Sequence, residues 1–207
     1  LLVLELMQVA ESVNVNMGAN LLLNSDAKQI FTLATELNSY NKERQLLESE
    51  LLNNILQNKK INLSSPILIL HGENWHEGVI GIIASRIKEK FNKPTIIISI
   101  KKDIGKASAR SVYGFDIGSI IINATQKGLL LKGGGHKMAG GFTIDVSKIE
   151  EFKDYVIKKF KSSKINLDKE KNFYVDSIVS PSALNIDFYS KINILAPFGS
   201  ANPEPNL

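Results

Sequence analysis

The sequence predicts an α/β fold, and three observations support that prediction. Short apolar runs at residues 66–70 and 95–100 have the length and composition of buried strands. Between them, residues 79–91 repeat apolar side chains at helical spacing. Residues 106–112 then alternate like a third strand. Strands and helices that alternate along a chain are typical of α/β domains.

A long helix is predicted before this unit, over residues 25–57, with Ser25 or Asp26 as its N-cap. A polar turn at residues 38–44 is expected to bend or interrupt it. After the unit, the sequence predicts a helix at residues 119–130 and a closing strand at 140–146. A helix capped by Ser147 follows at 147–161, then a linker at 161–171 and a further strand at 172–179.

Composition limits the class of protein. With 207 residues, of which 43% are hydrophobic, the chain can bury one main core with attachments. The absence of cysteine excludes disulfides and thiolate metal sites and fits the cytoplasm, where we expect the protein. No run of about 18 apolar residues occurs, so no membrane partner is expected, and the apolar start is a poor signal peptide. The net charge of +4 permits an anionic partner.

The first candidate site is the glycine-containing turn at residues 72–81, between a strand and a helix. Such a turn can direct backbone N–H groups and the positive end of the helix toward a phosphate. Alternatively it is a tight turn in which Trp75 covers the core and His76 is exposed by chance. Arg86, on the helix that follows, is more typical of a solvated helix face.

The second candidate combines Gly133, Gly134 and Gly135 with His136, followed by two more glycines at 140–141. Three glycines in a row lose much backbone entropy on folding. We therefore predict a functional loop that passes close to a ligand and presents the histidine, rather than a merely flexible loop.

The third candidate is the strand that carries Lys106, Ser108 and Arg110 on one face. A hydroxyl between two cations suits a phosphate, and arginine offers it a bidentate fork. The alternative is an edge strand protected by charge. The sequence shows no Asp and His cluster at metal-ligand spacing, no nucleophile elbow and no P-loop. The residues alone therefore indicate a module that binds a phosphate-bearing ligand without a hydrolytic centre of its own.

Three blocks together resemble the DHHA1 domain of the RecJ-type exonucleases, which belong to the DHH phosphoesterase family. They are Trp75–Arg86, Ser108–Ser111 and the glycine-rich segment 133–141. Residues 41–45 resemble the end of the connecting helix in that family, and residues 196–205 resemble the start of its OB-type domain.

The resemblance implies single-stranded DNA as partner and a 5′–3′ exonuclease activity in DNA repair and recombination. It implies two Mn²⁺ or Mg²⁺ ions held by a separate DHH domain, with no cofactor in this chain. His136 would stabilise charge on the scissile phosphate, and Ser108 with Arg110 would hold the 5′-end phosphate. Trp75 and His76 would lie along the DNA path. The remaining residues assigned to the strand-binding surface are Arg86, Lys106, Gly133, Gly134 and Gly135.

The resemblance also implies an organisation: a connecting helix at 18–62, a DHHA1-type mixed sheet flanked by helices at 63–163, and the start of an OB-type domain at 170–207. Residues 1–17 fit none of these. Codons that encode Leu1 to Asn14 can be chosen so that, read in a shifted frame, they encode Ile-Gly-Pro-Arg-Ile-Asn-Ala-Gly-Gly-Arg-Val-Gly-Lys. The family carries this segment at that position. We interpret residues 1–17 as an out-of-frame tail, and expect a nuclease by descent that is inert alone.

Two other functions stay open. The chain could be a DNA-binding module that assists a separately encoded DHH half. It could instead come from another DHH phosphodiesterase that acts on short oligonucleotides, although the block from Trp75 to Arg86 and residues 197–199 argue against that relative. The sequence does not define an oligomeric state.

Overall fold

The computed structural model describes residues 15–57, 61–163, 165, 175–199 and 202–207. The chain divides into two compact units, Leu1–Ile165 and Asn166–Leu207. Most of the predicted out-of-frame tail, up to residue 14, lies outside the described residues.

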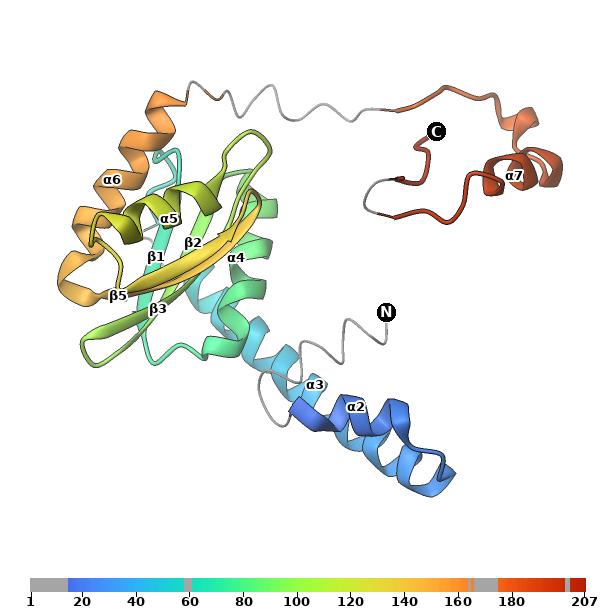
Figure 1. Ribbon diagram of the computed structural model, residues 1–207, viewed down its shortest axis with the longest axis horizontal. Coiled ribbons are helices and arrows are strands. Elements are labelled where there is room, and N and C mark those ends of the chain that lie inside the picture. The colour runs from blue at the N-terminus through green and yellow to red at the C-terminus, as the bar shows by residue number, and fades with distance from the viewer. Residues whose placement is uncertain (1–14, 58–60, 164, 166–174, 200–201) are drawn as a thin grey trace. The chain divides into compact units, whose positions relative to one another are not determined.

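The first unit contains a five-stranded mixed sheet, which confirms the predicted fold class (Figure 1). The strand order is β1-β2-β3-β5-β4, with β1 parallel to β2 and the other neighbours antiparallel. The strands are β1 (Leu68–Glu73), β2 (Thr95–Lys101), β3 (Ile104–Arg110), β4 (Lys132–His136) and β5 (Ala139–Asp145). The helices of this unit are α2 (Val15–Leu23), α3 (Ala27–Gln57), α4 (Glu77–Phe91), α5 (Ile117–Gln126) and α6 (Ile149–Ser162).

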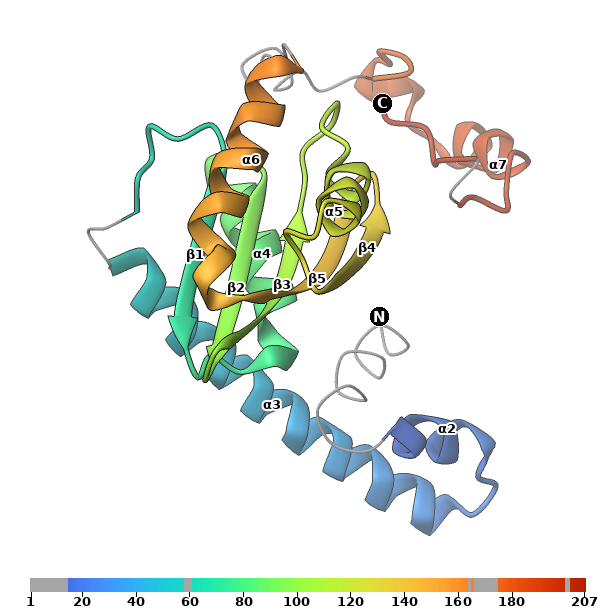
Figure 2. The same cartoon turned by 60° about the vertical axis from the view of Figure 1, so that its left-hand side comes forward.

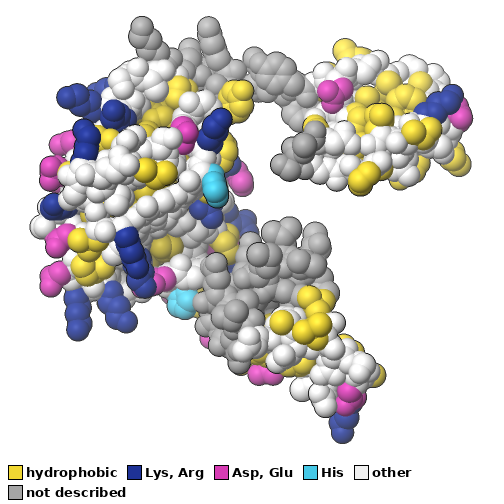
Figure 3. Space-filling view, in the orientation of Figure 1, with side chains coloured by type: hydrophobic (Ala, Val, Ile, Leu, Met, Phe, Trp, Pro, Cys, Tyr) yellow, Lys and Arg dark blue, Asp and Glu magenta, His cyan; other side chains and the backbone are white. Residues whose placement is uncertain are grey.

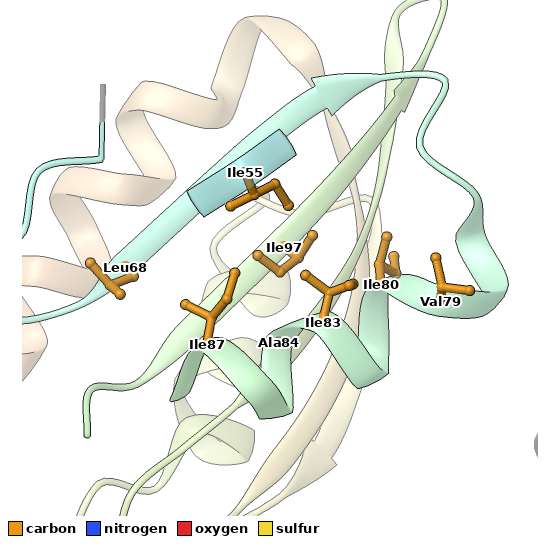
Figure 4. Close-up of a cluster of buried hydrophobic side chains, with 8 residues drawn as sticks. All are labelled: Ile55, Leu68, Val79, Ile80, Ile83, Ala84, Ile87 and Ile97. Carbon is orange, nitrogen blue, oxygen red and sulfur yellow. The ribbon is translucent and has the colours of Figure 1, made fainter. Parts of the chain in front are cut away.

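Helices cover both faces of the sheet, with α4 on one side and α5 and α6 on the other (Figures 1 and 2). The alternation of β2 explains these two layers, because Ile97 points into the α4 cluster while Ile96 and Ile98 are buried on the opposite side. Figure 4 shows Ile83 and Ile87 of α4 against Ile97. Each fully buried isoleucine contributes about 1.5–3 kcal/mol, so this layer fixes the position of α4 firmly.

The second layer contains two aromatic pairs among its buried aliphatic side chains. The ring of Phe142 on β5 lies 4.8 Å from that of Phe152 on α6, and Phe115 packs edge-on against Phe160 at 4.9 Å. Helix α6 follows a short 3-10 turn, η1 (Val146–Lys148). The predicted cap, Ser147, lies inside that turn, and Asp145 accepts a hydrogen bond from its backbone N–H instead.

Helix α3 runs without interruption through residues 38–44, where a polar turn was expected. Those residues keep helical geometry because Arg44 bonds to Asn41 and Glu48 at helical spacing. Asp26 is the residue that caps the helix, by accepting from the N–H of Lys28.

The glycine-rich segment 132–136 is the strand β4, and not the loop that the sequence predicted. A Cβ on Gly133 would lie 2.7 Å from Ile121 and Phe142, and one on Gly135 would lie 2.4 Å from the carbonyl oxygen of Ala139. These two glycines are therefore required for close packing of the strand, whereas the sequence analysis explained them by a loop that passes close to a ligand.

In the second unit, the described residues form a 3-10 turn η3 (Pro181–Ala183), the helix α7 (Ile186–Asn193) and an isolated bridge between Gly199 and Asn202. Residues 172–174 of the predicted strand lie outside the described residues, and residues 175–179 form no strand. Asp176 donates one backbone hydrogen bond to the carbonyl of Asn206, but among the described residues no ladder forms along residues 175–179 that would make them a strand. The OB-type continuation stays a prediction.

Candidate functional site

A groove of about 790 Å³ lies beside the sheet on the face that carries α4. Helix α4 packs over β2 and β3, and its N-terminal half forms the wall of the groove. Strands β3, β5 and β4 form the floor. The lining residues with side chains or backbone in the groove include Glu77, Gly78, Gly81, Lys106, Ser108, Arg110, Lys132, Gly133, Gly141 and Thr143.

The strand register arranges the floor in three rows. Residues directly opposite each other on antiparallel strands present their side chains to the same face. Because Gly133 and Gly140 direct their Cβ positions toward Ile121 of α5, their neighbours Gly134 and Gly141 face the groove. The rows are Lys106–Thr143–Lys132, Ser108–Gly141–Gly134 and Arg110–Ala139–His136.

The predicted shared face of Lys106, Ser108 and Arg110 is therefore present, and it lies on the groove. The Arg110 guanidinium donates to the hydroxyl of Ser108 at 3.1 Å and to the carbonyl of Ala109 at 2.9 Å. Lys106 forms an ion pair of 2.6 Å with Glu77 on the wall. These contacts hold two cations at either end of one strand face, with a hydroxyl between them.

Gly81 lets the wall approach this face closely. A Cβ there would lie 3.2 Å from a terminal nitrogen of Arg110 and 3.3 Å from the Ser108 hydroxyl oxygen. Glycine inside a helix costs about 1 kcal/mol relative to alanine. Its presence here is explained by the room it leaves for the guanidinium.

His136 is exposed at the end of β4, on the row of Arg110. The middle row combines Ser108 with two glycines, and a Cβ on Gly134 would meet nothing within 4 Å. The floor is thus flat at its centre and flanked by polar side chains. Such a floor allows a sugar-phosphate backbone to come close to the sheet.

Trp75, His76 and Arg86 lie outside the residues that line the groove. The indole of Trp75 packs on Gly72, where a Cβ would come within 2.3 Å of the ring, and borders the α4 cluster. His76 caps α4, because its Nδ1 accepts from the N–H of Gly78 at 3.2 Å. Arg86 forms an ion pair with Glu48 of α3.

Cations predominate in the groove. Its ionisable lining side chains are Lys106, Arg110 and Lys132, with Glu77 as the single acid. Figure 3 shows that Lys and Arg side chains elsewhere on the visible face of the first unit are mixed with Asp and Glu. The groove therefore suits an anionic ligand better than its surroundings do.

The donor set does not suit a metal ion. Mn²⁺ and Mg²⁺ prefer several carboxylate oxygens, and the one lining carboxylate is paired with Lys106. Across the part of the chain that the structure describes, no three His, Asp or Glu side chains come together at metal-binding distance. Nor does any helix within that part have the length and apolar character needed to cross a bilayer.

Sequence reasoning missed Lys132 and Thr143, and it gave Glu77, Gly81 and Gly141 no individual role although they lie in its candidate segments. A helical glycine is a signal that could have indicated Gly81. The floor residues depend on the pairing of β4 with β5, which the sequence alone does not give.

Comparison with known proteins identifies this architecture. Residues 64–162 match the DHHA1 domain family. The chain is 27% identical to the single-stranded-DNA-specific exonuclease RecJ of Bacillus subtilis, over 92% of this chain and 24% of that protein. It is 31% identical to RecJ of Dickeya dadantii, over 94% of this chain and 35% of that protein. The crystal structure of RecJ from Thermus thermophilus in complex with Mg²⁺ superposes with a TM-score of 0.77 at 27% identity, over 97% of this chain and 31% of that one.

The sheet and its groove are therefore those of a DHHA1 domain. The similarity extends beyond that domain along most of the chain, and the chain belongs to the RecJ family. It spans about a quarter to a third of the length of the curated relatives named here.

Proposed function

We propose that this chain is the strand-binding part of a single-stranded-DNA-specific 5′–3′ exonuclease of DNA repair and recombination. The observation that carries the proposal is the three-row groove floor, which places Ser108 and Arg110 beside a row of glycines. The named relatives are single-stranded-DNA-specific exonucleases, which supports the choice of ligand.

The 5′-end phosphate binds at the Arg110 end of the groove. The guanidinium fork offers two parallel donors to phosphate oxygens, and the Ser108 hydroxyl adds a third. His136 lies on the same row as Arg110, on the far side of Ala139. It donates to the next phosphate and stabilises the charge of that phosphate. Phosphate contacts of this kind need no sequence readout, as expected for a general exonuclease.

Lys106 and Lys132 hold the strand at the opposite end of the groove. The pair between Lys106 and Glu77 is about half exposed at both side chains. An exposed pair of this kind is worth about 0–1 kcal/mol, so the lysine can exchange it for a phosphate at little cost. Hydrolysis belongs, in this proposal, to a DHH domain whose two metal ions would supply the attacking water.

The proposal is tested with Arg110→Ala and two oligonucleotides that differ only in a 5′-phosphate or a 5′-hydroxyl. Fluorescence anisotropy with a 3′-label measures both affinities. We expect the variant to lose about 1.5–3 kcal/mol of binding to the phosphorylated strand, and much less to the hydroxyl strand, because the lost contact is charge-assisted.

Lys158→Ala is the matched control, since it removes an exposed cation from α6, on the far side of the sheet. It should leave both affinities unchanged. An equal loss for both strands in Arg110→Ala would instead identify Arg110 as a general backbone contact, and no loss would refute the proposed site.

A further inference from the structure

Helix α3 packs against two separate apolar clusters. Near its start, Leu37 packs with Met17 of α2. Near its end, Ile55 joins the cluster of α4 and the sheet (Figure 4). Figure 2 shows the helix leaving the sheet domain between these two ends. The place where it leaves carries the buried carboxylate of Glu48, which is only 4% exposed.

Glu48 connects the two helices. One carboxylate oxygen accepts from Arg44 of the same helix at 3.0 Å, and the other forms an ion pair with Arg86 of α4. Arg44 is itself oriented by Asn41, whose side-chain oxygen accepts two hydrogen bonds of 2.9 and 3.2 Å from the guanidinium. Asn41, Arg44 and Arg86 come from two of the sequence blocks singled out above, 41–45 and 75–86, whereas Glu48 lies outside both. None of the four lines the groove.

The free-energy terms of the Glu48 contacts indicate that these contacts orient the two helices more than they stabilise the fold. Taking the Glu48 carboxylate out of water costs free energy that its partners roughly offset, and the Arg86 side chain is 58% exposed, so the pair adds little net stability. Its hydrogen bonds are directional, whereas the apolar contacts of Ile55 are not. Rotation of α3 by one residue would move Arg44 and Glu48 together, because both lie on α3, and would separate Glu48 from Arg86 of α4.

We infer that Glu48 and Arg86 form a clamp that fixes the angle at which α3 leaves the sheet domain, with Arg44 and Asn41 holding Glu48 in position. Glu48 and Arg86 are positioning residues, because neither lines the groove. Taken with the proposed function, on which this consequence rests, the clamp sets the position of the groove relative to a DHH domain at the other end of the helix.

The exit angle can be measured directly in the whole chain. The sequence contains no cysteine, so Lys28→Cys on α3 and Lys158→Cys on α6 give two spin labels without background. Lys28 lies about 30 Å from Glu48 along the helix, at 1.5 Å per residue. A change of about 20° in crossing angle, within the normal scatter for packed helices, moves it by about 10 Å.

We expect Arg86→Ala to broaden or shift the electron–electron distance distribution between the labels. This variant keeps the pair between Arg44 and Glu48, so the carboxylate stays compensated and the fold is retained, which the thermal midpoint of unfolding checks. Arg86→Lys should restore part of the narrow distribution. Glu50→Gln, an exposed acid on the same helix, is the matched control and should change nothing.

The clamp is refuted if the distance distribution between the labels in Arg86→Ala has the same width and the same centre as in the parent protein. The affinity of the same samples for 5′-phosphorylated single-stranded DNA should be unchanged by Arg86→Ala, because the groove is intact. If the unsubstituted chain fails to bind that strand, the proposed function fails, while the distance measurement still decides whether the clamp exists.

Discussion

Arg110 is arranged for its ligand before a ligand arrives. Its guanidinium bonds to Ser108 and to a main-chain carbonyl of its own strand, and Gly81 leaves room beside it. A side chain that is already ordered loses less rotamer entropy on binding, which is worth about 0.5–1.5 kcal/mol for a long side chain. In the proposed function, this preordering favours the binding of a phosphate at Arg110.

The glycines of β4 have two different roles, which substitution should separate. Gly134→Val places its side chain in the open groove, so we expect unchanged stability and a weaker affinity for single-stranded DNA. Gly133→Ala forces a methyl group against Ile121 and Phe142 and should lower the free energy of unfolding by about 1–3 kcal/mol. Urea denaturation and anisotropy measure the two effects.

The two glycine variants also test the strand register. If Gly134→Val unfolds the protein while Gly133→Ala is tolerated, the assignment of faces on β4 is inverted, and the three rows of the floor are wrong.

At the level of secondary structure, the sequence predicted the strands whose positions depend on the polarity pattern of their side chains. The isoleucine runs identified β1 and β2, and alternation identified the groove face of β3. It missed β4, because glycine has a low strand propensity and only the contacts with Ile121, Phe142 and Ala139 explain why glycine is needed there.

Helix α5, which packs beside β4, depends on the cap at Asp116. Its carboxylate accepts from the N–H of Ser119 at 3.0 Å, and this hydrogen bond lowers the pKa of Asp116 below its usual value. A lowered folded-state pKa means that the stabilisation is present above the unfolded pKa and is lost as the pH falls through the folded value.

We therefore expect Asp116→Ala to cost about 1 kcal/mol of unfolding free energy at neutral pH. The difference from the parent protein should shrink at acidic pH, where the parent carboxyl is protonated. Asp116→Asn, which keeps an acceptor, should lose less. Urea denaturation at neutral and acidic pH measures this, and a cost that is independent of pH would show that the charge of Asp116 contributes nothing.

At the scale of the whole molecule, the groove could not be predicted from the sequence, since its wall and floor come from distant segments. Glu77 and Gly81 precede Ser108 by a helix and a strand, and Gly134 reaches the floor only through the pairing of β4 with β5. The family resemblance nevertheless pointed to residues of β3 that line the groove. It also assigned Trp75 and Arg86 to the strand path, whereas in the structure Trp75 packs on Gly72 and Arg86 forms an ion pair with Glu48.

The proposed position of single-stranded DNA across β3, β5 and β4 is tested by titration of the ¹⁵N-labelled chain with a 5′-phosphorylated oligonucleotide. We expect the largest amide shift changes on the three rows of the floor, around Ser108, Gly134 and Gly141. Shift changes that leave these amides unmoved and gather on α6 or in the second unit would contradict it.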